Sequence, residues 1–153
     1  MPNLQIREAT AEDADGVAAL VNNVLREQFD RATIPDLTPV AARAIERDGH
    51  WYFVAMDGEK IVGYCALHRV PFLLMGGDEG YLSELFIDGG QRGGGIGGAL
   101  LDKAVATAKA QGFQRLRLIN MRNRDSYKRG FYTKRGWRER PDGADFVLDL
   151  TDD

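Results

Sequence analysis

The sequence predicts a mixed α/β fold, with an antiparallel hairpin region in the first half and a βαβ unit in the second. Three observations lead to this class. The chain has 153 residues, which suits one domain. The spacing of apolar residues switches between helical and strand periods. The predicted elements follow the order β-α-α-β-β-β-α-β-α-β, and we expect one domain over residues 1–153.

The first predicted elements are a short strand and two helices. Leu4 and Ile6 alternate as a strand that ends at Thr10, which with Asp13 resembles a capping box. Apolar residues from Val17 to Phe29 recur at three- and four-residue spacing, which predicts a helix with one buried stripe. The segment Ile34–Leu37 interrupts. A second helix then starts at Thr38-Pro39 and ends near Gly49.

Later elements are marked by turns and by apolar alternation. Asp57-Gly58 favours a tight hairpin between strands at 51–56 and 61–67, because such turns need positive φ angles. Glycines stop the predicted helices. The remaining elements are, in order, a turn at 76–80, a strand at 81–88, a helix at 100–110 that starts near Gly97, a strand at 113–118, a helix at 125–135 and a sixth strand over Phe146, Leu148 and Leu150.

Composition and charge exclude several classes of protein. The net charge of −3 argues against a globally basic nucleic-acid binder, although residues 114–140 carry ten basic and two acidic side chains. That stretch is either a solvated surface or one wall of a site for a polyanion. Cys65 cannot form an internal disulfide, and with His50 and His68 it does not make a structural zinc site. Without a signal-peptide pattern or an apolar span, we expect a cytoplasmic protein with no membrane partner.

The most informative segment is glycine-rich. Seven of the ten residues from Gly89 to Gly98 are glycine, between a strand and a helix. Such a loop lets backbone amides converge on a phosphate, and the helix N-terminus adds unpaired amides and a positive dipole end. Two familiar phosphate loops fit poorly. The G-x-G-x-x-G pattern from Gly93 follows an antiparallel region, and the sequence lacks Gly-Lys-Ser/Thr after these glycines.

Three motifs together resemble the GNAT superfamily of acetyl-CoA-dependent N-acetyltransferases. Arg92-x-x-Gly95-x-Gly97 looks like the family's pyrophosphate loop, Tyr81–Ile87 is similar to its fourth strand, and Phe131–Trp137 resembles its late F-Y-x-K-x-G-F segment. The resemblance implies a mostly antiparallel central sheet, flanked by helices, whose fourth and fifth strands splay apart. It also implies acetyl-CoA as cosubstrate, with no metal.

The resemblance assigns cofactor contacts residue by residue. The pantetheine arm would pair with the backbone of Phe86 and Ile87 in the gap between the splayed strands. Relatives often carry an asparagine seven residues before the late tyrosine. Here that position is Asp125, which we expect to face away from the cofactor, so Asn123 is the candidate instead. The predicted cofactor-binding residues are Phe86, Ile87, Arg92, Gly93, Gly94, Gly95, Ile96, Gly97, Gly98 and Asn123.

Two residues are candidates for the chemistry. Tyr132 occupies the position of the family's tyrosine near the sulfur, which would protonate the departing thiolate. Glu84 is either the base that deprotonates the amine or a charge contact for a cationic substrate. Strand alternation would place Leu82, Glu84 and Phe86 on one face, where Glu84 would be an acid among apolar neighbours. Cys65 is expected to be a buried strand residue, since the sequence offers no positioned histidine to activate it.

The strand Tyr81–Ile87 looks most like that of diamine and polyamine acetyltransferases, which suggests a small cationic amine as substrate. In the family, the segment Phe29–Leu37 would form the substrate-side wall. Several alternatives stay open. The acceptor could instead be a peptide or protein amine, an amino acid or an aminoglycoside. The protein could also be a non-catalytic acyl-CoA sensor or bind nucleic acid through residues 114–140, which ranks last. A homodimer also stays open.

Overall fold

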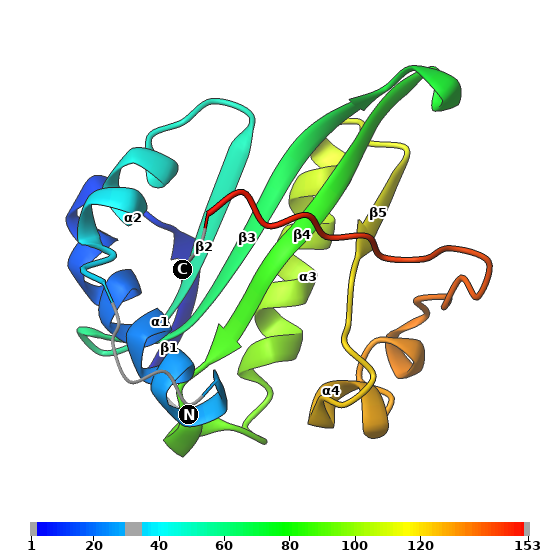
Figure 1. Ribbon diagram of the computed structural model, residues 1–153. Coiled ribbons are helices and arrows are strands. Elements are labelled where there is room, and N and C mark those ends of the chain that lie inside the picture. The colour runs from blue at the N-terminus through cyan, green and yellow to red at the C-terminus, as the bar shows by residue number, and fades with distance from the viewer. Residues whose placement is uncertain (1–2, 30–34, 152–153) are drawn as a thin grey trace. The chain divides into compact units, whose positions relative to one another are not determined.

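Five strands form one sheet in the order β1-β2-β3-β4-β5, within a computed structural model that describes residues 3–29 and 35–151 (Figure 1). β1 to β4 pair antiparallel, and β5 runs parallel to β4. The described chain divides into two compact units, residues 1–119 and 120–153, and the sheet lies in the first. The strands are β1 Leu4–Glu8, β2 His50–Asp57, β3 Lys60–Phe72, β4 Gly77–Ile87 and β5 Arg115–Leu118.

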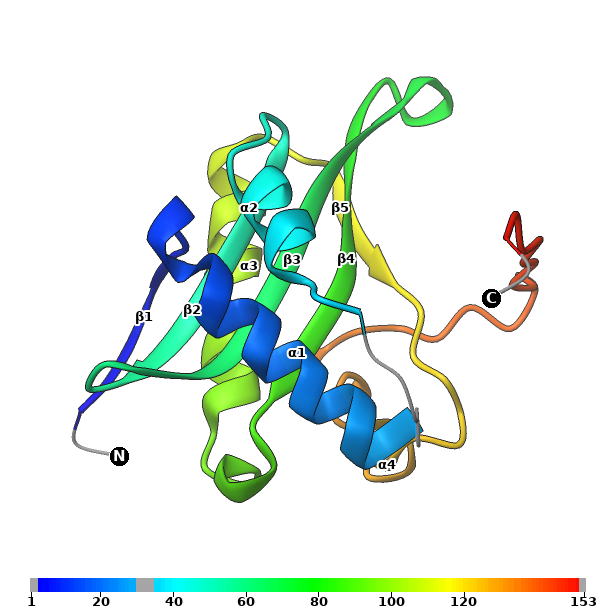
Figure 2. The same ribbon diagram turned by 60° about the vertical axis from the view of Figure 1, so that its left-hand side comes forward.

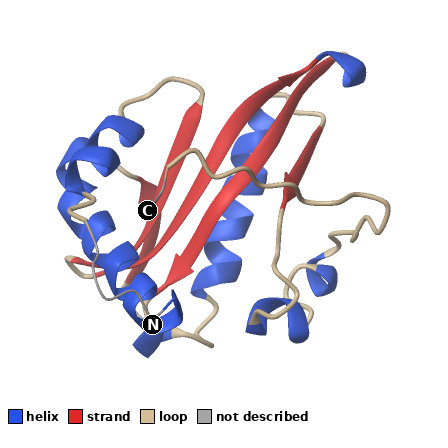
Figure 3. Cartoon of the chain, in the orientation of Figure 1, coloured by secondary structure: helices blue, strands red, loops and turns tan. Residues whose placement is uncertain are grey.

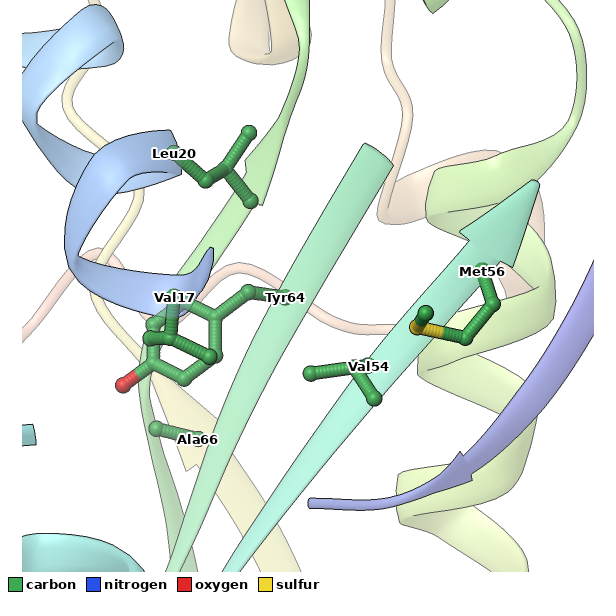
Figure 4. Close-up of a cluster of buried hydrophobic side chains, with 6 residues drawn as sticks. All are labelled: Val17, Leu20, Val54, Met56, Tyr64 and Ala66. Carbon is green, nitrogen blue, oxygen red and sulfur yellow. The ribbon is translucent and has the colours of Figure 1, made fainter. Parts of the chain in front are cut away.

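Helices cover both faces of this sheet. Helices α1 (Ala14–Phe29) and α2 (Thr38–Ile45) lie on one face, and α3 (Ile96–Ala110) lies on the other (Figure 2). The α1 side is anchored by a buried cluster that includes Val17 and Leu20 from α1 and Val54, Met56, Tyr64 and Ala66 from β2 and β3 (Figure 4). The predicted mixed α/β fold with helices on a mostly antiparallel sheet is confirmed.

β4 extends beyond its pairing with β5, which ends at Leu118. Glu79–Leu82 pairs with Arg115–Leu118, and the remaining residues of β4, Ser83–Ile87, pair with β3 but not with β5. The backbone groups of this part of β4 that point away from β3 therefore have no strand partner among the described residues.

A β-bulge in β4 overturns one prediction about faces. Ala66 pairs with Glu84 and the next residue, Leu67, pairs with Leu82, so Ser83 is the extra residue. Because a bulge interrupts the two-residue period, Leu82 lies on the α3 face with Leu67, while Glu84 lies on the α1 face with Ala66. The prediction that Leu82 shares a face with Glu84 and Phe86 is wrong. It holds for Glu84 and Phe86, which lie on the same side of the bulge.

Element ends differ from the predictions in small ways. The Asp57-Gly58 turn is confirmed between β2 and β3. The next turn lies earlier than predicted: a 3₁₀ segment at Leu73–Met75 ends at Gly76, which has φ 73°, and β4 already begins at Gly77. α2 ends at Ile45, four residues before Gly49, and α3 begins at Ile96. Most of the predicted interruption at 34–37 is described, but residues 30–34 lie outside the described residues.

The second unit contains less regular structure than predicted. The expected helix over 125–135 is wrong in extent: α4 covers Asp125–Lys128, and a separate 3₁₀ turn covers Thr133–Arg135. Gly130, with φ 68°, separates them because a left-handed residue cannot continue a right-handed helix. The predicted sixth strand is also wrong, since described residues after Arg135 form no helix or strand (Figure 3). Phe146, Leu148 and Leu150 are at least 83% exposed, and alternation alone supplies no pairing partner.

Candidate functional site

The glycine loop leads from β4 into the N-terminus of α3. Residues Gly89–Gln91 form a 3₁₀ turn, Arg92 is extended, and Gly93 and Gly95 take φ angles of 85° and 82°. A Cβ added at either of these two glycines would meet nothing within 4 Å, so the loop is an open cradle. Gly95 is the N-cap of α3 and has no side chain to cap the first-turn amides. The amides of Ile96, Gly97 and Gly98 are therefore available to an anion.

Arg92 stands beside this cradle and pairs with an acid from α1. Its Nη2 lies 3.5 Å from Glu27 Oε2, and both side chains are about half exposed. Glu27 also crowds Gly89, where an added Cβ would lie 2.8 Å from Oε2. An exposed pair at this distance is weak, so Arg92 can exchange Glu27 for a phosphate at little cost.

A pocket of about 490 Å³ lies between α1, α2 and strands β2 to β4. Aliphatic side chains from α1 and α2, among them Val21, Leu25 and Ile45, form much of its wall. Tyr52, Tyr64, Glu84 and Phe86 line it from the strands. Phe29 and Leu37, the ends of the predicted substrate-side wall, also line it. Within the described lining, Glu84 is the only side chain that carries a carboxylate.

Glu84 is held in this pocket by a hydrogen bond. The Tyr64 hydroxyl donates to Glu84 Oε1 at 2.8 Å, from a ring that is 4% exposed and stacks on Tyr52. Burial, and then the negative charge of Glu84, raise the pKa of Tyr64 well above its usual value. The same two causes raise the pKa of Tyr52, against the positive charge of Arg47. Both tyrosines stay protonated near neutral pH, so Glu84 is the acceptor.

Cys65 is a buried strand residue, as predicted. It is 0% exposed, and burial raises the pKa of its thiol to about 12. A thiol that stays protonated cannot serve as the nucleophile.

Polar contacts link the two histidines to the bulge. His50 Nδ1 lies 2.7 Å from His68 Nδ1, and His68 Nε2 lies 2.5 Å from Ser83 Oγ. His68 is half-buried, and burial followed by the proximity of His50 lowers its pKa. Sequence reasoning missed this cluster. Counting residue pairs outward from the Asp57-Gly58 turn places His50 within one residue of facing His68, so the sequence could have indicated this pair. Nothing in the sequence indicates the bulge that brings Ser83 to His68.

The second unit holds the other two predicted site residues. Tyr132 is half-buried, and its ring meets Phe131 and Trp137 edge to face, with centroids 4.9 and 5.8 Å away. Asn123 is exposed in the turn before α4. Asp125 opens α4, is 89% exposed, and pairs with Arg129 at 3.1 Å. The cofactor contacts and catalytic roles assigned to these residues stay predictions.

Several arginines of the basic stretch already have acidic partners. Arg115 and Arg117 of β5 both pair with Glu79, a β4 residue that is 2% exposed. In the second unit, Arg122 pairs with Glu139 at 3.4 Å. The buried carboxylate of Glu79 thus engages Arg115 and Arg117, whereas the exposed pair of Arg122 with Glu139 is as weak as that of Arg92 and does not decide whether Arg122 could contact a phosphate.

The described residues contain neither a metal-binding group nor a membrane-spanning helix. No three His, Cys, Asp or Glu side chains in residues 3–29 and 35–151 gather into a group that could hold a metal ion. Within the same ranges, every helix is too short or too polar to cross a bilayer.

Comparisons with known proteins agree with the geometry. The family model described as acetyltransferase (GNAT) family matches residues 17–137. An aminoalkylphosphonate N-acetyltransferase from Salmonella typhimurium is 31% identical over 140 residues, covering 91% of this chain and 88% of that protein. An aminoglycoside acetyltransferase from an uncultured soil metagenomic sample shares the fold, with a TM-score of 0.81 at 20% identity over 98% of both chains.

A further solved structure is a transcriptional regulator from Bacillus halodurans, with a TM-score of 0.79 and 26% identity over 95% of this chain and 99% of that one. These proteins of similar fold differ in function, so likeness of fold alone does not select an activity. The family match covers residues 17–137. The alignment with the Salmonella N-acetyltransferase covers 91% of this chain and 88% of that protein. The chain belongs to the GNAT acetyltransferase family and is an N-acetyltransferase.

Proposed function

We propose that this enzyme transfers an acetyl group from acetyl-CoA to the primary amine of a small substrate held in the pocket between α1, α2 and β4. The observation that supports this proposal is the position of Glu84. Its carboxylate lines an otherwise apolar pocket, accepts a hydrogen bond from Tyr64, and comes from the part of β4 that has no β5 partner. A carboxylate fixed at such a place attracts an ammonium group.

The residues of the glycine loop fit the proposed cosubstrate. The open cradle at Gly93 and Gly95 and the uncapped first turn of α3 suit a pyrophosphate. Arg92 would add a guanidinium, and Phe86 and Ile87 would offer backbone groups across the gap from β5. When bound, acetyl-CoA supplies the activated acetyl thioester. Asn123 remains a proposed contact on the family resemblance alone.

The proposed chemistry uses two side chains, Glu84 and Tyr132. Glu84 would hold the substrate ammonium and orient its nitrogen, and it is also a candidate for taking its proton. Tyr132 would donate a proton to the leaving sulfur, a role that follows from the resemblance of Phe131–Trp137 to the family segment. A tyrosine is suited to this role because its hydroxyl is protonated at neutral pH.

The charges of the pocket lining bear on the substrate class. A diamine or polyamine needs a second anionic partner, and the described lining offers no carboxylate besides Glu84. An amine with an anionic group at its other end needs a cation instead. The described lining holds no Arg or Lys either, although Arg47 lies near enough to Tyr52 for its positive charge to act on the pKa of that tyrosine. The activity of the Salmonella relative therefore favours an aminoalkylphosphonate over the polyamine suggested by the strand sequence.

Two measurements test the proposal in sequence. Calorimetric titration with acetyl-CoA should show binding by the native enzyme and none by Gly95→Val, because Val at φ 82° is strained and fills the cradle. Gly90→Ala is the control, since that position has space and is not among the positive-φ glycines. Undiminished binding by Gly95→Val would overturn the loop assignment.

Thiol release is then measured with 2-aminoethylphosphonate, a diamine of similar length and an N-terminal peptide amine. We expect the phosphonate to react best. Glu84→Gln should raise its KM about tenfold, the order expected for one charge-assisted contact, and Tyr132→Phe should lower kcat more than it changes acetyl-CoA affinity. Preference for the diamine or the peptide would replace the proposed substrate class. Binding without turnover of any amine would identify a sensor.

A further inference from the structure

The two histidines of this chain lie together in one hydrogen-bonded line. The sequence contains only His50 and His68. They face each other across β2 and β3, 2.7 Å apart at their Nδ1 atoms, and His68 continues through Nε2 to Ser83 Oγ at 2.5 Å. A hydrogen bond between two Nδ1 atoms requires that one carries a proton and the other does not, so the rings hold unlike tautomers.

The inner end of this line, Ser83, directly precedes a residue of the proposed acceptor pocket. Ser83 is the bulge residue, the first residue of β4 beyond its pairing with β5, and it is exposed. The next residue is Glu84, which lines the pocket. Tyr52, another lining residue, meets the His68 ring edge to face with centroids 5.8 Å apart. The outer end, His50, is the first residue of β2 and is partly exposed.

We propose that His68, supported by His50, receives the proton that the acceptor ammonium loses, by way of the Ser83 hydroxyl. This inference rests on the proposed acceptor pocket. It gives Glu84 the role of holding the ammonium and gives the histidines the role of base. Ser83 is then a catalytic residue that touches the substrate, and His68 and His50 are positioning residues that act through it.

The proton transfer balances within these groups. The ammonium N–H bond breaks and leaves its electron pair on nitrogen, while Ser83 Oγ accepts that proton and passes its own to the bare Nε2 of His68. The Nδ1 proton of His68 then moves to His50 Nδ1, and His50 releases its Nε2 proton to water. The net change is a neutral amine and one proton in solvent, and the histidine tautomers are restored by proton exchange with water.

The charged and titratable surroundings suit a neutral imidazole at His68. His50 and Tyr52 face it from β2, and Tyr81 and Glu84 share its side of the sheet from β4. Arg47, which follows α2, acts on Tyr52. Burial and the second imidazole lower the pKa of His68, so this ring is uncharged at neutral pH.

The kinetic test compares His68→Gln with the native enzyme across pH, using the amine that the native enzyme turns over best. We expect kcat at pH 7 to fall about 100-fold, the usual contribution of general base catalysis, with KM for the amine changed less than about twofold. The native kcat should rise with pH through the histidine range and then level. The variant should lose that inflection and gain activity only as alkali deprotonates the amine. Unchanged kcat and inflection would overturn the proposal.

Ser83→Ala keeps both histidines and guards against a folding defect, because Ser83 is exposed. We expect it to lose kcat in the same direction with an unchanged melting temperature, and full activity with the native pH profile would overturn the relay. Glu84→Gln separates this inference from the proposed pocket. The Glu84→Gln variant should raise KM for the amine, so an unaltered KM would refute the proposed pocket. If instead the dependence of kcat on pH is unaltered in His68→Gln, only the relay is refuted.

Nitrogen-15 NMR of histidine-labelled protein gives a readout that does not depend on turnover. With two histidines, every imidazole signal can be assigned by the two single variants. Near pH 7.5 we expect His68 to be protonated at Nδ1 and His50 at Nε2. The reverse arrangement would leave a proton on His68 Nε2, where the relay needs a bare nitrogen, and would overturn the proposal, as would two rings that are both protonated at Nε2.

Discussion

At the scale of single residues, the hydrogen bond between Tyr64 and Glu84 determines where the pocket carries its negative charge. Tyr64 is held by its own burial among Val17, Val54 and Ala66 in the core under α1. Its hydroxyl is therefore a fixed donor, and the carboxylate that accepts from it loses rotational freedom before any substrate arrives. Substrate charge recognition thus depends on a core residue that need not touch the substrate.

Tyr64→Phe tests this dependence. The ring should stay packed, while loss of a hydrogen bond to a charged group should cost about 1.5 kcal/mol of unfolding free energy. KM for the amine should rise several-fold because Glu84 is no longer oriented. Chemical denaturation and steady-state kinetics measure the two effects. Tyr52→Phe is the matched control, since it alters the stacked neighbour and leaves the Tyr64–Glu84 bond intact. Equal KM values for both variants would contradict the assigned role.

At the scale of elements, the sequence was informative where local chemistry determines structure. The Asp57-Gly58 turn, the apolar stripe of α1 and the glycine run before α3 each depend on neighbours within a few residues, and each was predicted. The bulge at Ser83 depends on how β3 pairs with β4, so strand alternation misplaced Leu82. The same limit applies to Phe146–Leu150, whose alternation allows a strand but supplies no partner.

The candidate site also combines residues that the sequence indicates with residues that only the structure brings together. The sequence makes the glycine loop and Glu84 candidates because one is a continuous motif and the other lies within a recognisable strand. The pairing of Tyr64 with Glu84, and of His50 with His68 and Ser83, joins residues 15 to 20 positions apart. Only the register of three strands brings these side chains together, and register is set by the whole sheet.

Gly63→Ala tests how the sheet positions the cofactor loop. A Cβ at Gly63 would lie 2.9 Å from both Ile96 Cγ2 and Leu100 Cδ1, in the first turns of α3. We expect overpacking to cost about 1–3 kcal/mol and to move the N-terminus of α3, weakening acetyl-CoA binding. Thermal unfolding and calorimetry measure both effects. Gly90→Ala, which meets open space, should retain the native melting temperature. A Gly63→Ala enzyme as stable as the native one would show that α3 is not held by this contact.

At the scale of the whole molecule, its titratable groups predict how stability varies with pH. The pKa of Asp13 is lowered by hydrogen bonds from Arg7, at 2.7 and 2.9 Å, and from the Thr10 amide. Stability from this group is present above the ordinary Asp value of about 3.9 and is lost as the pH falls through the lowered value. The pKa of His68 is also lowered in the folded chain. Below about pH 6.5 the unfolded chain therefore binds more protons at this residue than the folded chain does, so stability falls as the pH falls.

The two tyrosines of the pocket determine how stability falls at alkaline pH, because their pKa values are raised and not lowered. Tyr52 and Tyr64 have raised pKa values, so above about pH 10 the unfolded chain ionises while the folded chain does not, and stability falls as the pH rises. We therefore expect the unfolding free energy to be greatest between about pH 7 and 9 and to decline in two acidic steps. Urea denaturation at each pH measures the curve. In the curve of unfolding free energy against pH, His68→Gln should flatten the step near pH 6 and Asp13→Asn should flatten the step below pH 4. If a variant keeps the step assigned to its residue, another group must cause that step.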